Sequence, residues 1–269
     1  MTAQDVTVPY HTLRPLSRVL AGLQPRTQIA FLAPYLHSGM RILDCGCGDG
    51  AVTCELARWV EPGTVVGIDV ESASIERAQA YARAHDVGNV SFETGSVLEI
   101  PFDSHSFDLV FCNGVLCQMA HPELALIEMQ RVTHPRGIVA AREPDYTGAL
   151  WYPDSIGMQQ AYTLQLRAIE ALGGNLRVGR ALRYYFAEAG MSYSEGSASC
   201  DSYGTPESIE ALASYLRKAW QEAQWSQHIR NECWIDELTI ASFLEAISEF
   251  SEDPNAFLAI PWCEAISSV

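Results

Sequence analysis

The chain has 269 residues, 48% of them hydrophobic, which is enough to bury the core of one large globular domain. Its formal net charge of −16 argues against nucleic acid or an anionic membrane as a partner, because phosphate surfaces are bound through clustered Lys and Arg. The first ten residues lack the basic and apolar regions of a signal peptide, and no stretch approaches the roughly 20 apolar residues of a membrane span. We therefore expect a cytoplasmic protein.

The cysteine and lysine content excludes further classes. Eight cysteines are scattered through apolar segments without the paired CxxC spacing of a metal site. We interpret them as reduced, mostly buried small side chains and predict no metal ion. Lys218 is the only lysine, so the chain has no Tyr-x-x-x-Lys pair of the kind that short-chain dehydrogenases use.

Residues 1–40 carry no strand signal, but 26–36 have an amphipathic pattern that predicts a helix in an N-terminal leader or lid. From 41 to 145, short β-type runs alternate with helix-type runs, as in a parallel sheet covered on both faces. The expected strands are 40–45, 64–70, 89–96, 107–113 and 137–143. The expected helices are 51–60, 72–86 and 122–133, the second with Ser72 as N-cap and Glu76 in its first turn.

The region 146–269 begins in a loop rich in Pro, Gly and aromatic residues, and we expect it to form a helical cap and the last strands of the sheet. The expected helices are 156–172, 179–189, 206–231 and 236–251, and the expected strands are 191–199 and 256–267. Pro261 would confine the last strand to an edge or cut it short. The pattern predicts an α/β fold with a doubly wound sheet.

The run Cys45-Gly-Cys-Gly-Asp-Gly50 lies between the first strand and the first helix of this sheet. A glycine loop in that place exposes backbone N–H groups to a ligand at the helix N-terminus. Gly46, Gly48 and Ala51 also satisfy the dinucleotide pattern G-x-G-x-x-A, with Asp69 ending the next strand. The motif alone does not separate NAD from other adenosine ligands, although Asp44, just before the loop, would repel a pyrophosphate.

Four segments in order resemble one family: "ILDCGCGDG", "VVGIDVESASIERA", "FETGSVLEIPFDSHSFDLVFCNGVL" and "EMQRVTHPRGIVAAREPD". They are similar to the class I S-adenosylmethionine-dependent methyltransferases, in the ubiquinone-biosynthesis-like branch that acts on small molecules. The resemblance is strong over 41–145. It implies a Rossmann-like, seven-stranded, mostly parallel sheet, with S-adenosylmethionine as cofactor and S-adenosylhomocysteine as product.

Carried over position by position, the resemblance implies cofactor contacts on the loops at the strand ends. Gly46 and Gly48 would let the methionine part of the cofactor approach the backbone of a loop that Asp44 orients. Asp69 would accept hydrogen bonds from both ribose hydroxyls.

The remaining cofactor contacts follow the later strands. Val70 would pack against the adenine, and Ser96 and Val97 would meet its edge. Asn113 and Gly114 would approach the methionine amino group. Three positions depart from the family pattern: Ser96 replaces a frequent Asp, 134–137 replaces a Lys-Pro-Gly-Gly turn, and 117–118 lacks a frequent His.

Catalytic candidates lie where the fold would place them over the cofactor methyl group. In the leader, Tyr10 and His11 are candidates for chemistry, Tyr10 also for contact with the cofactor, and Arg26 for binding the cofactor carboxylate. Glu143 and Asp145 follow the fifth strand and could hold or deprotonate a substrate.

Aromatic residues after the fifth strand suggest the kind of acceptor. Tyr146, Trp151 and Tyr152 would supply flat apolar walls for a bulky, partly aromatic molecule. Their loop is loosely similar to that of gliotoxin thiol methyltransferase and other natural-product methyltransferases. We therefore predict a small-molecule methyltransferase of secondary metabolism, monomeric or homodimeric, that methylates C, N, O or S. The alternatives are a nucleic-acid or protein methyltransferase, a non-catalytic cofactor-binding protein and an NAD-dependent oxidoreductase.

Overall fold

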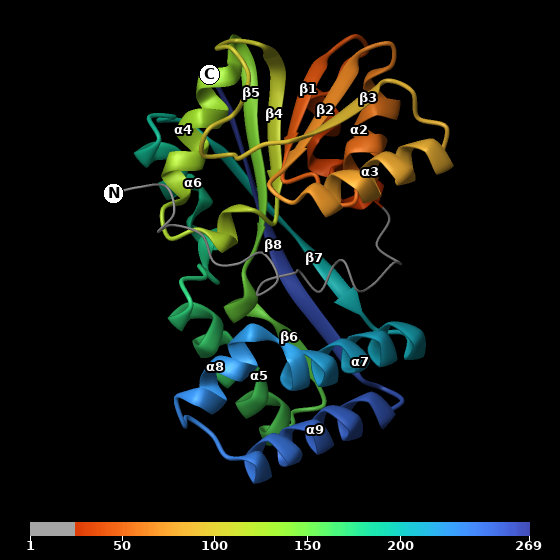
Figure 1. Ribbon diagram of the computed structural model, residues 1–269, viewed down its shortest axis with the longest axis vertical. Coiled ribbons are helices and arrows are strands. Elements are labelled where there is room, and N and C mark those ends of the chain that lie inside the picture. Colours follow the sequence, from red (N-terminus) through yellow and green to blue (C-terminus); the bar gives the residue numbers. More distant parts are fainter. Residues whose placement is uncertain (1–24) are drawn as a thin grey trace.

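The computed structural model describes residues 25–269, in which eight strands form one sheet with the order β3-β2-β1-β4-β5-β8-β6, and β7 also pairs with β8 (Figure 1). The strands are β1 Arg41–Cys45, β2 Thr64–Asp69, β3 Val90–Thr94, β4 Phe107–Asn113, β5 Thr133–Pro144, β6 Leu150–Tyr152, β7 Glu195–Tyr203 and β8 Phe257–Ser268. The expected α/β fold with a mostly parallel sheet is confirmed. The sheet has eight strands where seven were expected, and the strand without a counterpart among the expected strands is the three-residue β6.

The helices form three groups according to their place in the fold. A short α1 (Pro25–Gln28) and the 3-10 helix η4 (Ala30–Tyr35) precede the sheet. The helices along the parallel strands are α2 Ala51–Val60, α3 Ser72–Ala84, α4 Pro122–Val132 and α6 Val178–Glu188, with short 3-10 turns η5 Leu116–Gln118 and η6 Tyr146–Gly148. The cap helices are α5 Ile156–Ala171, α7 Pro206–Glu222, α8 Gln224–Asn231 and α9 Glu237–Glu252.

The parallel strands are buried on both faces, because alternate side chains feed two different cores. In β1, Ile42 joins a core with Leu32 of η4 and Leu56 of α2. Its neighbour Leu43 points to the other face and joins a core with residues of α4 and α6, including Met129. This double burial explains why the strands are continuous apolar runs in the sequence.

The last strand, β8, is central to the C-terminal half of the sheet. Its residues 262–268 pair antiparallel with β5, 257–259 pair with β6, and 258–266 pair with β7. Pro261 therefore does not confine β8 to an edge or shorten it, contrary to expectation. Its carbonyl accepts a hydrogen bond from the Asp145 N–H at 2.9 Å, between the ends of β5 and β6, so the missing N–H faces the break between these two strands.

The cap has its own apolar core, built around the lower part of β7 and β8 in Figure 1. Trp220 and Trp225 are both buried, with ring centroids 4.9 Å apart in an edge-to-face contact. The cap core continues onto Tyr203 and Trp262, which belong to β7 and β8. The two strands thus connect the cap to the parallel half of the sheet.

Several expected helix details need correction. The helix expected at 26–36 is divided into α1 and η4, and Pro34 lies inside the latter. Ser72 is the first residue of α3 rather than its N-cap, which is Glu71, and no acidic residue lies in the first turn. The helix expected at 206–231 is interrupted at Ala223, whose ψ of 149° is extended.

Within residues 25–269, no helix is both long and apolar enough to cross a membrane. The division into a leader at 1–40, a core at 41–145 and a cap with the last strands at 146–269 stays a prediction.

Candidate cofactor and substrate site

The glycine loop joins β1 to α2 at the carboxyl edge of the parallel strands. The N–H groups of Gly46 and Cys47 both donate to the Ile68 carbonyl of β2, at 2.7 and 2.9 Å. Gly46 has a φ of 77°, and a Cβ there would collide with the side chain of Val115, which follows β4. The loop is therefore pressed closely between the ends of β2 and β4.

Asp44 lies beneath this loop and is only 2% exposed. Its Oδ2 accepts a hydrogen bond from the Thr53 hydroxyl of α2 at 2.6 Å. Burial raises the pKa of the Asp44 carboxyl from 3.8 to about 7, with the Thr53 hydrogen bond opposing the rise and the charge of Asp69 adding to it. A cationic group near the loop would favour the ionised form of this carboxyl.

Asp69 ends β2 and links the glycine loop to the start of α3. Its Oδ2 accepts from the Gly48 N–H at 3.0 Å, and its Oδ1 accepts from the Glu71 N–H at 3.0 Å. Next to it, Val70 is 60% exposed, which is unusual for a large apolar side chain directly after a buried strand. A carboxylate beside an uncovered apolar surface suits a ribose and the flat ring attached to it.

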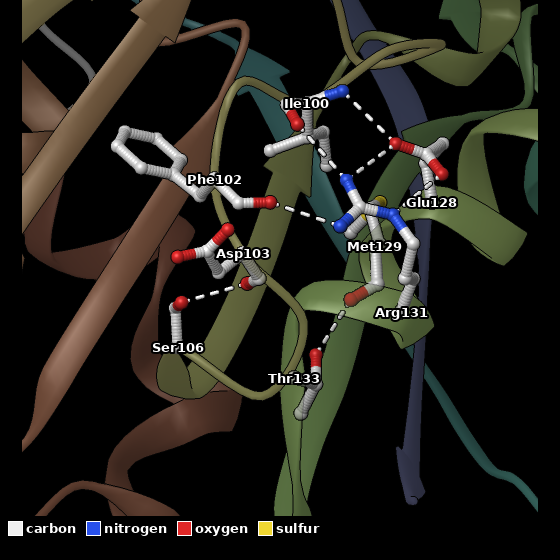
Figure 2. A network of polar contacts seen from close by, with 8 residues as sticks. All are labelled: Ile100, Phe102, Asp103, Ser106, Glu128, Met129, Arg131 and Thr133. Carbon is white, nitrogen blue, oxygen red and sulfur yellow. Dashed lines mark hydrogen bonds and ion pairs between the residues drawn. The ribbon is translucent and has the colours of Figure 1, made fainter.

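The loop after β3 carries Ser96 and Val97. The Ser96 hydroxyl accepts from the Leu98 N–H at 3.2 Å, which stabilises the turn, and Val97 is buried. Figure 2 shows how α4 holds the following residues: the Arg131 guanidinium donates to the carbonyls of Ile100 and Phe102, both at 2.9 Å. The loop that presents Ser96 is thereby fastened to a helix.

A carboxylate on the same helix completes this fastening. Glu128 accepts from the Ile100 N–H at 3.0 Å and from the Arg131 side chain at 2.8 Å. The hydrogen bond from Arg131 holds the pKa of Glu128 below its usual range, so the pair stays charged near neutral pH.

Asn113, at the end of β4, contacts both the N-terminal helix and β5. Its amide donates to Gln28 Oε1 of α1 at 2.7 Å, and its Oδ1 accepts from Arg142 at 3.5 Å. The next residue, Gly114, donates its N–H to the Arg142 carbonyl at 2.9 Å and has a φ of 67°. The end of β4 therefore lies beside the described start of the chain.

Glu143 is fully buried and binds the backbone of the segment after β4. One of its oxygens accepts from the N–H groups of Val115 and Leu116, both at 2.9 Å, and the other accepts from that of Cys117 at 3.1 Å. Burial raises the pKa of Glu143 to about 7 against these hydrogen bonds. Glu143 therefore fixes the backbone of residues 115–117. The expectation that Glu143 could hold or deprotonate a substrate stays a prediction.

The Asp145 carboxylate is also bound by neighbouring side chains. It forms an ion pair with Arg180 of α6, whose Nη2 donates to Oδ1 at 2.9 Å, and the Thr147 hydroxyl donates to the same oxygen at 2.9 Å. Asp145 itself is 4% exposed, so the pair fastens the turn after β5 to α6.

The three aromatic residues expected to contact a substrate do not share one surface. Tyr146 is buried in the cap core, and its carbonyl accepts from the Tyr162 hydroxyl at 2.9 Å. Trp151 is half-buried and packs edge-to-face on Tyr162 with centroids 5.2 Å apart. Tyr152 is 56% exposed and, as the next residue of β6, points to the opposite face.

The candidates from the leader are placed differently. Tyr10 and His11 lie outside the described residues. Arg26 stacks over the indole of Trp59, with its guanidinium carbon 5.1 Å from the ring centroid, beside Glu55 and Arg58 on α2. The structure therefore places Arg26 against the second half of α2 and not at the glycine loop.

One group of polar residues near the site was missed by sequence reasoning. Arg142 is 2% exposed, and its Nη2 donates to Asp201 of β7 at 2.8 Å. Glu264 of β8 lies 3.8 Å from Arg142 and is also buried. The sequence did contain a signal for this group, because Arg142 and Glu264 are charged residues within otherwise apolar strand segments.

The eight cysteines are free thiols, and the five buried ones fill space in the first half of the sheet and the segments beside it. Among residues 25–269, no group of three or more His, Cys, Asp or Glu side chains is placed to hold a metal ion.

Comparison with known proteins gives a family match. Residues 36–190 match the family described as "Methyltransferase domain". An uncharacterised methyltransferase of Schizosaccharomyces pombe is 32% identical over 171 residues, which are 61% of this chain and 61% of that protein. The 27-O-demethylrifamycin SV methyltransferase of Amycolatopsis mediterranei is 27% identical over 259 residues, 94% of this chain and 83% of that protein. A demethylmenaquinone methyltransferase of Bacillus cereus is 31% identical over 185 residues, 68% of this chain and 70% of that protein.

Solved structures share the fold at low sequence identity. The YcgJ protein of Bacillus subtilis has a TM-score of 0.60 and 15% identity, covering 91% of this chain and 99% of its own. The [4+2]-cyclase SpnF has a TM-score of 0.56 and 19% identity, covering 95% of this chain and 93% of its own. The chain spans only 52% to 61% of the length of the first three curated relatives that it matches.

Proposed function

Because this chain belongs to the methyltransferase-domain family, whose cofactor is S-adenosylmethionine, we propose that it is a methyltransferase acting on a bulky, partly aromatic small molecule. The observation that carries the proposal is the meeting of three strand ends around the glycine loop. Gly48 donates to Asp69 of β2 at 3.0 Å, and Gly46 is packed against Val115 after β4. Ligands of open α/β sheets bind where such strand ends meet.

The residues present at this edge fit the cofactor. The glycine loop, in which Gly46 has a φ of 77°, would receive the methionine part, and Asp69 offers a carboxylate to the ribose. The exposed Val70 would be covered by the adenine, near Ser96 and Val97, and Asn113 and Gly114 would lie toward the amino group.

When bound, the cofactor supplies an electrophilic methyl group on a sulfonium sulfur. The protein's own contribution is to hold an acceptor atom in line with that group and to exclude water. Glu143 would contribute to this alignment by binding backbone N–H groups, and Asp145 would contribute by its ion pair with Arg180. Neither would act as a base. We leave C, N, O and S open as the methylated atom.

The acceptor class is proposed on three grounds. The net charge of −16 disfavours binding to nucleic acid or to an anionic membrane, so we expect neither as a partner. We further propose that the protein is cytoplasmic and is a monomer or a homodimer. The cap adds aromatic side chains below the strand ends. The relative that matches 94% of this chain is named for a rifamycin, a small molecule. A cyclase shares the fold, so the fold by itself does not indicate methyl transfer. The proposal of methyl transfer is therefore based on the family match and on the sequence relatives.

Binding measurements test the cofactor assignment directly. S-adenosylmethionine and S-adenosylhomocysteine are expected to raise the melting temperature, whereas NAD is not. Asp69→Ala should abolish binding of S-adenosylhomocysteine in calorimetry, and Asp69→Asn should weaken it about 10- to 100-fold, because one charge-assisted pair of hydrogen bonds is lost. The exposed Asp103→Asn serves as the matched control and should bind like the wild type. Stabilisation by NAD alone, or unchanged affinity of Asp69→Ala, would refute the proposal.

The acceptor itself is best found by labelling. Isotopically labelled S-adenosylmethionine offered to an extract of the source organism, with and without the protein, should yield a labelled small molecule detectable by mass spectrometry. Label found only in protein or nucleic acid would contradict the proposed acceptor class.

A further inference from the structure

A cavity of about 400 Å³ lies where β6 and the turn before it meet α5 and the start of α6. Its lining comes from three separate parts of the chain: residues 147–151, one face of α5, and Arg177. The lining residues of α5 recur at a spacing of three or four, which places them on one side of the helix: Gln159, Tyr162, Thr163, Leu166, Arg167 and Glu170. A cavity of this volume is large enough for a small ring-bearing molecule.

One wall of this cavity is aromatic, and its rings are held in place. Trp151 is half-buried and lies edge-to-face on Tyr162, with ring centroids 5.2 Å apart. The Tyr162 hydroxyl donates to the Tyr146 carbonyl at 2.9 Å, which fixes the orientation of the Tyr162 ring. Leu166 of α5 adds an aliphatic surface to the same cavity. The wall therefore offers a preformed apolar surface to a flat ring.

Three charged residues share the lining of the cavity: Arg167, Glu170 and Arg177, all of them exposed. Among the described residues, the side chain of none of the three forms an ion pair. Two guanidinium groups and one carboxylate leave one positive charge uncompensated, in a chain whose net charge is −16. Arg177 is also the N-cap of α6, whose first turn contains no acidic residue, so the helix dipole adds to the positive potential.

The cavity borders the proposed cofactor site without including it. The Tyr146 N–H donates to the Leu176 carbonyl at 3.1 Å, and the Asn175 N–H donates to the Cys117 carbonyl at 2.8 Å. Residues 175–176 thus join Arg177 to the segment after β4, which packs on the glycine loop. The lining contains none of the residues that we assign to the cofactor. A ligand in the cavity would therefore lie beside the cofactor and not in its place.

We propose that this cavity binds a small aromatic carboxylic acid in its singly charged form. The ring packs on Trp151 and Leu166, and the carboxylate accepts hydrogen bonds from Arg167 and Arg177. One carboxylate neutralises the uncompensated positive charge of the lining. A group with two negative charges would overcompensate it in the presence of Glu170, and a neutral ligand would leave it uncompensated.

The test compares 2-naphthoate with its neutral amide, 2-naphthamide, which has the same ring system and nearly the same shape. Titrations followed by ligand-observed NMR measure both affinities on the wild type, with and without S-adenosylhomocysteine. We expect 2-naphthoate to bind with a dissociation constant of about 1 mM or below, and about fivefold or more tightly than the amide, because only the acid forms charge-assisted hydrogen bonds on both sides. The affinity for 2-naphthoate should be the same with and without S-adenosylhomocysteine, because the cavity lies outside the cofactor site.

Charge-removing variants locate the carboxylate. Arg167→Gln and Arg177→Gln should each weaken 2-naphthoate about three- to tenfold and leave the affinity for 2-naphthamide within about twofold. Both side chains are exposed and form no ion pair among the described residues, so the melting temperature should not change. Arg83→Gln, at an exposed position of α3, removes the same charge away from the cavity and should bind both compounds like the wild type.

A blocking variant locates the ring. Thr163 is an exposed lining residue of α5, so Thr163→Trp should fill the cavity and prevent binding of both compounds. Gln160→Trp introduces the same side chain at a nearby exposed position of α5 that does not line the cavity, and it should leave both affinities unchanged.

Three results would each overturn the inference: no binding of 2-naphthoate, equal affinities of the acid and the amide, or binding that survives in Thr163→Trp. An acid preference that is lost equally in Arg83→Gln would also overturn it, because net charge alone would then explain the preference. The inference goes beyond the proposed function, since it requires neither methyl transfer nor a bound cofactor. Calorimetry of S-adenosylhomocysteine on the same samples keeps the two apart: cofactor binding without 2-naphthoate binding refutes only the inference, and the reverse refutes only the proposed function.

Discussion

Replacing Asp44 by asparagine is expected to change how the stability of the free protein depends on pH. The Asp44 carboxyl is 2% exposed, and burial raises its pKa from 3.8 to about 7. The unfolded chain therefore releases this proton at lower pH than the folded protein does. As pH rises from about 4 to 7, the folded state binds more protons than the unfolded state, so this group lowers the free energy of unfolding.

The magnitude follows from the two pKa values. Their difference corresponds to about 4 kcal/mol of lost stability once the carboxyl is ionised in both states. Between about pH 5.5 and pH 8.5, about 2 kcal/mol of this loss develops. Asparagine keeps an oxygen for the Thr53 hydroxyl but does not ionise. An unpaired amide hydrogen would add a cost of about 1–3 kcal/mol, but that cost would not vary with pH.

Urea unfolding of the ligand-free wild type and Asp44→Asn at these two pH values measures the effect. The free energy of unfolding of the variant, relative to the wild type, should rise by about 2 kcal/mol from the lower to the higher pH. The exposed Asp103→Asn should show no such change. Parallel pH profiles for Asp44→Asn and the wild type would show that the Asp44 carboxyl is not held in a buried, destabilised state.

Two other substitutions test the packing around the glycine loop. Glu143→Ala leaves the three N–H groups of residues 115–117 without their carboxylate acceptor, so we expect a loss of at least about 3 kcal/mol in urea unfolding, and a loss below about 1 kcal/mol would contradict this role. Gly46→Ala strains a residue with a φ of 77° and collides with Val115, so it should destabilise the protein by more than about 1 kcal/mol. Adding Val115→Ala should recover part of that loss in a double-mutant cycle, whereas additive effects would exclude the collision.

The parallel half of the sheet could be predicted from the sequence for a physical reason. Strands buried on both faces are apolar throughout, and turns rich in Gly, Pro, Asp and Ser separate them from helices with a period of 3.6. The range expected for the fourth strand, 107–113, is the one observed for β4, and 51–60 is the one observed for α2. The loops that carry the candidate cofactor residues could also be located, because they follow these strands directly.

The departures arise where distant residues decide the structure. The three-residue β6 forms only because residues 257–259 of β8 offer it a partner more than 100 residues later. Pro261 is tolerated inside the sheet because its missing N–H falls in the break between β5 and β6, which local sequence does not reveal.

The same limit applies to the candidate site. Asp145 follows β5, as expected from the sequence, whereas Glu143 lies inside this strand, which extends to Pro144. The partners of the two carboxylates could not be read from the sequence. Arg180 lies 35 residues after Asp145, and Asp201 lies 59 residues after Arg142. Pairing over such separations depends on the register of β5, β7 and β8. The sequence therefore identified these carboxylates as candidates but did not reveal their interaction partners.

The central position of β8 has a consequence for how the protein can fail. Residues 257–268 fill the gap between β5 and β7 and also hold β6. If proteolysis removed this segment, the backbone N–H and C=O groups of β5 and β7 would become two open edges at once, and the cap core would lose Leu258, Ile260 and Trp262. Open edges of this kind are templates for pairing with other chains. We therefore expect a chain cut just before β8 to aggregate rather than to persist as a separate methyltransferase core.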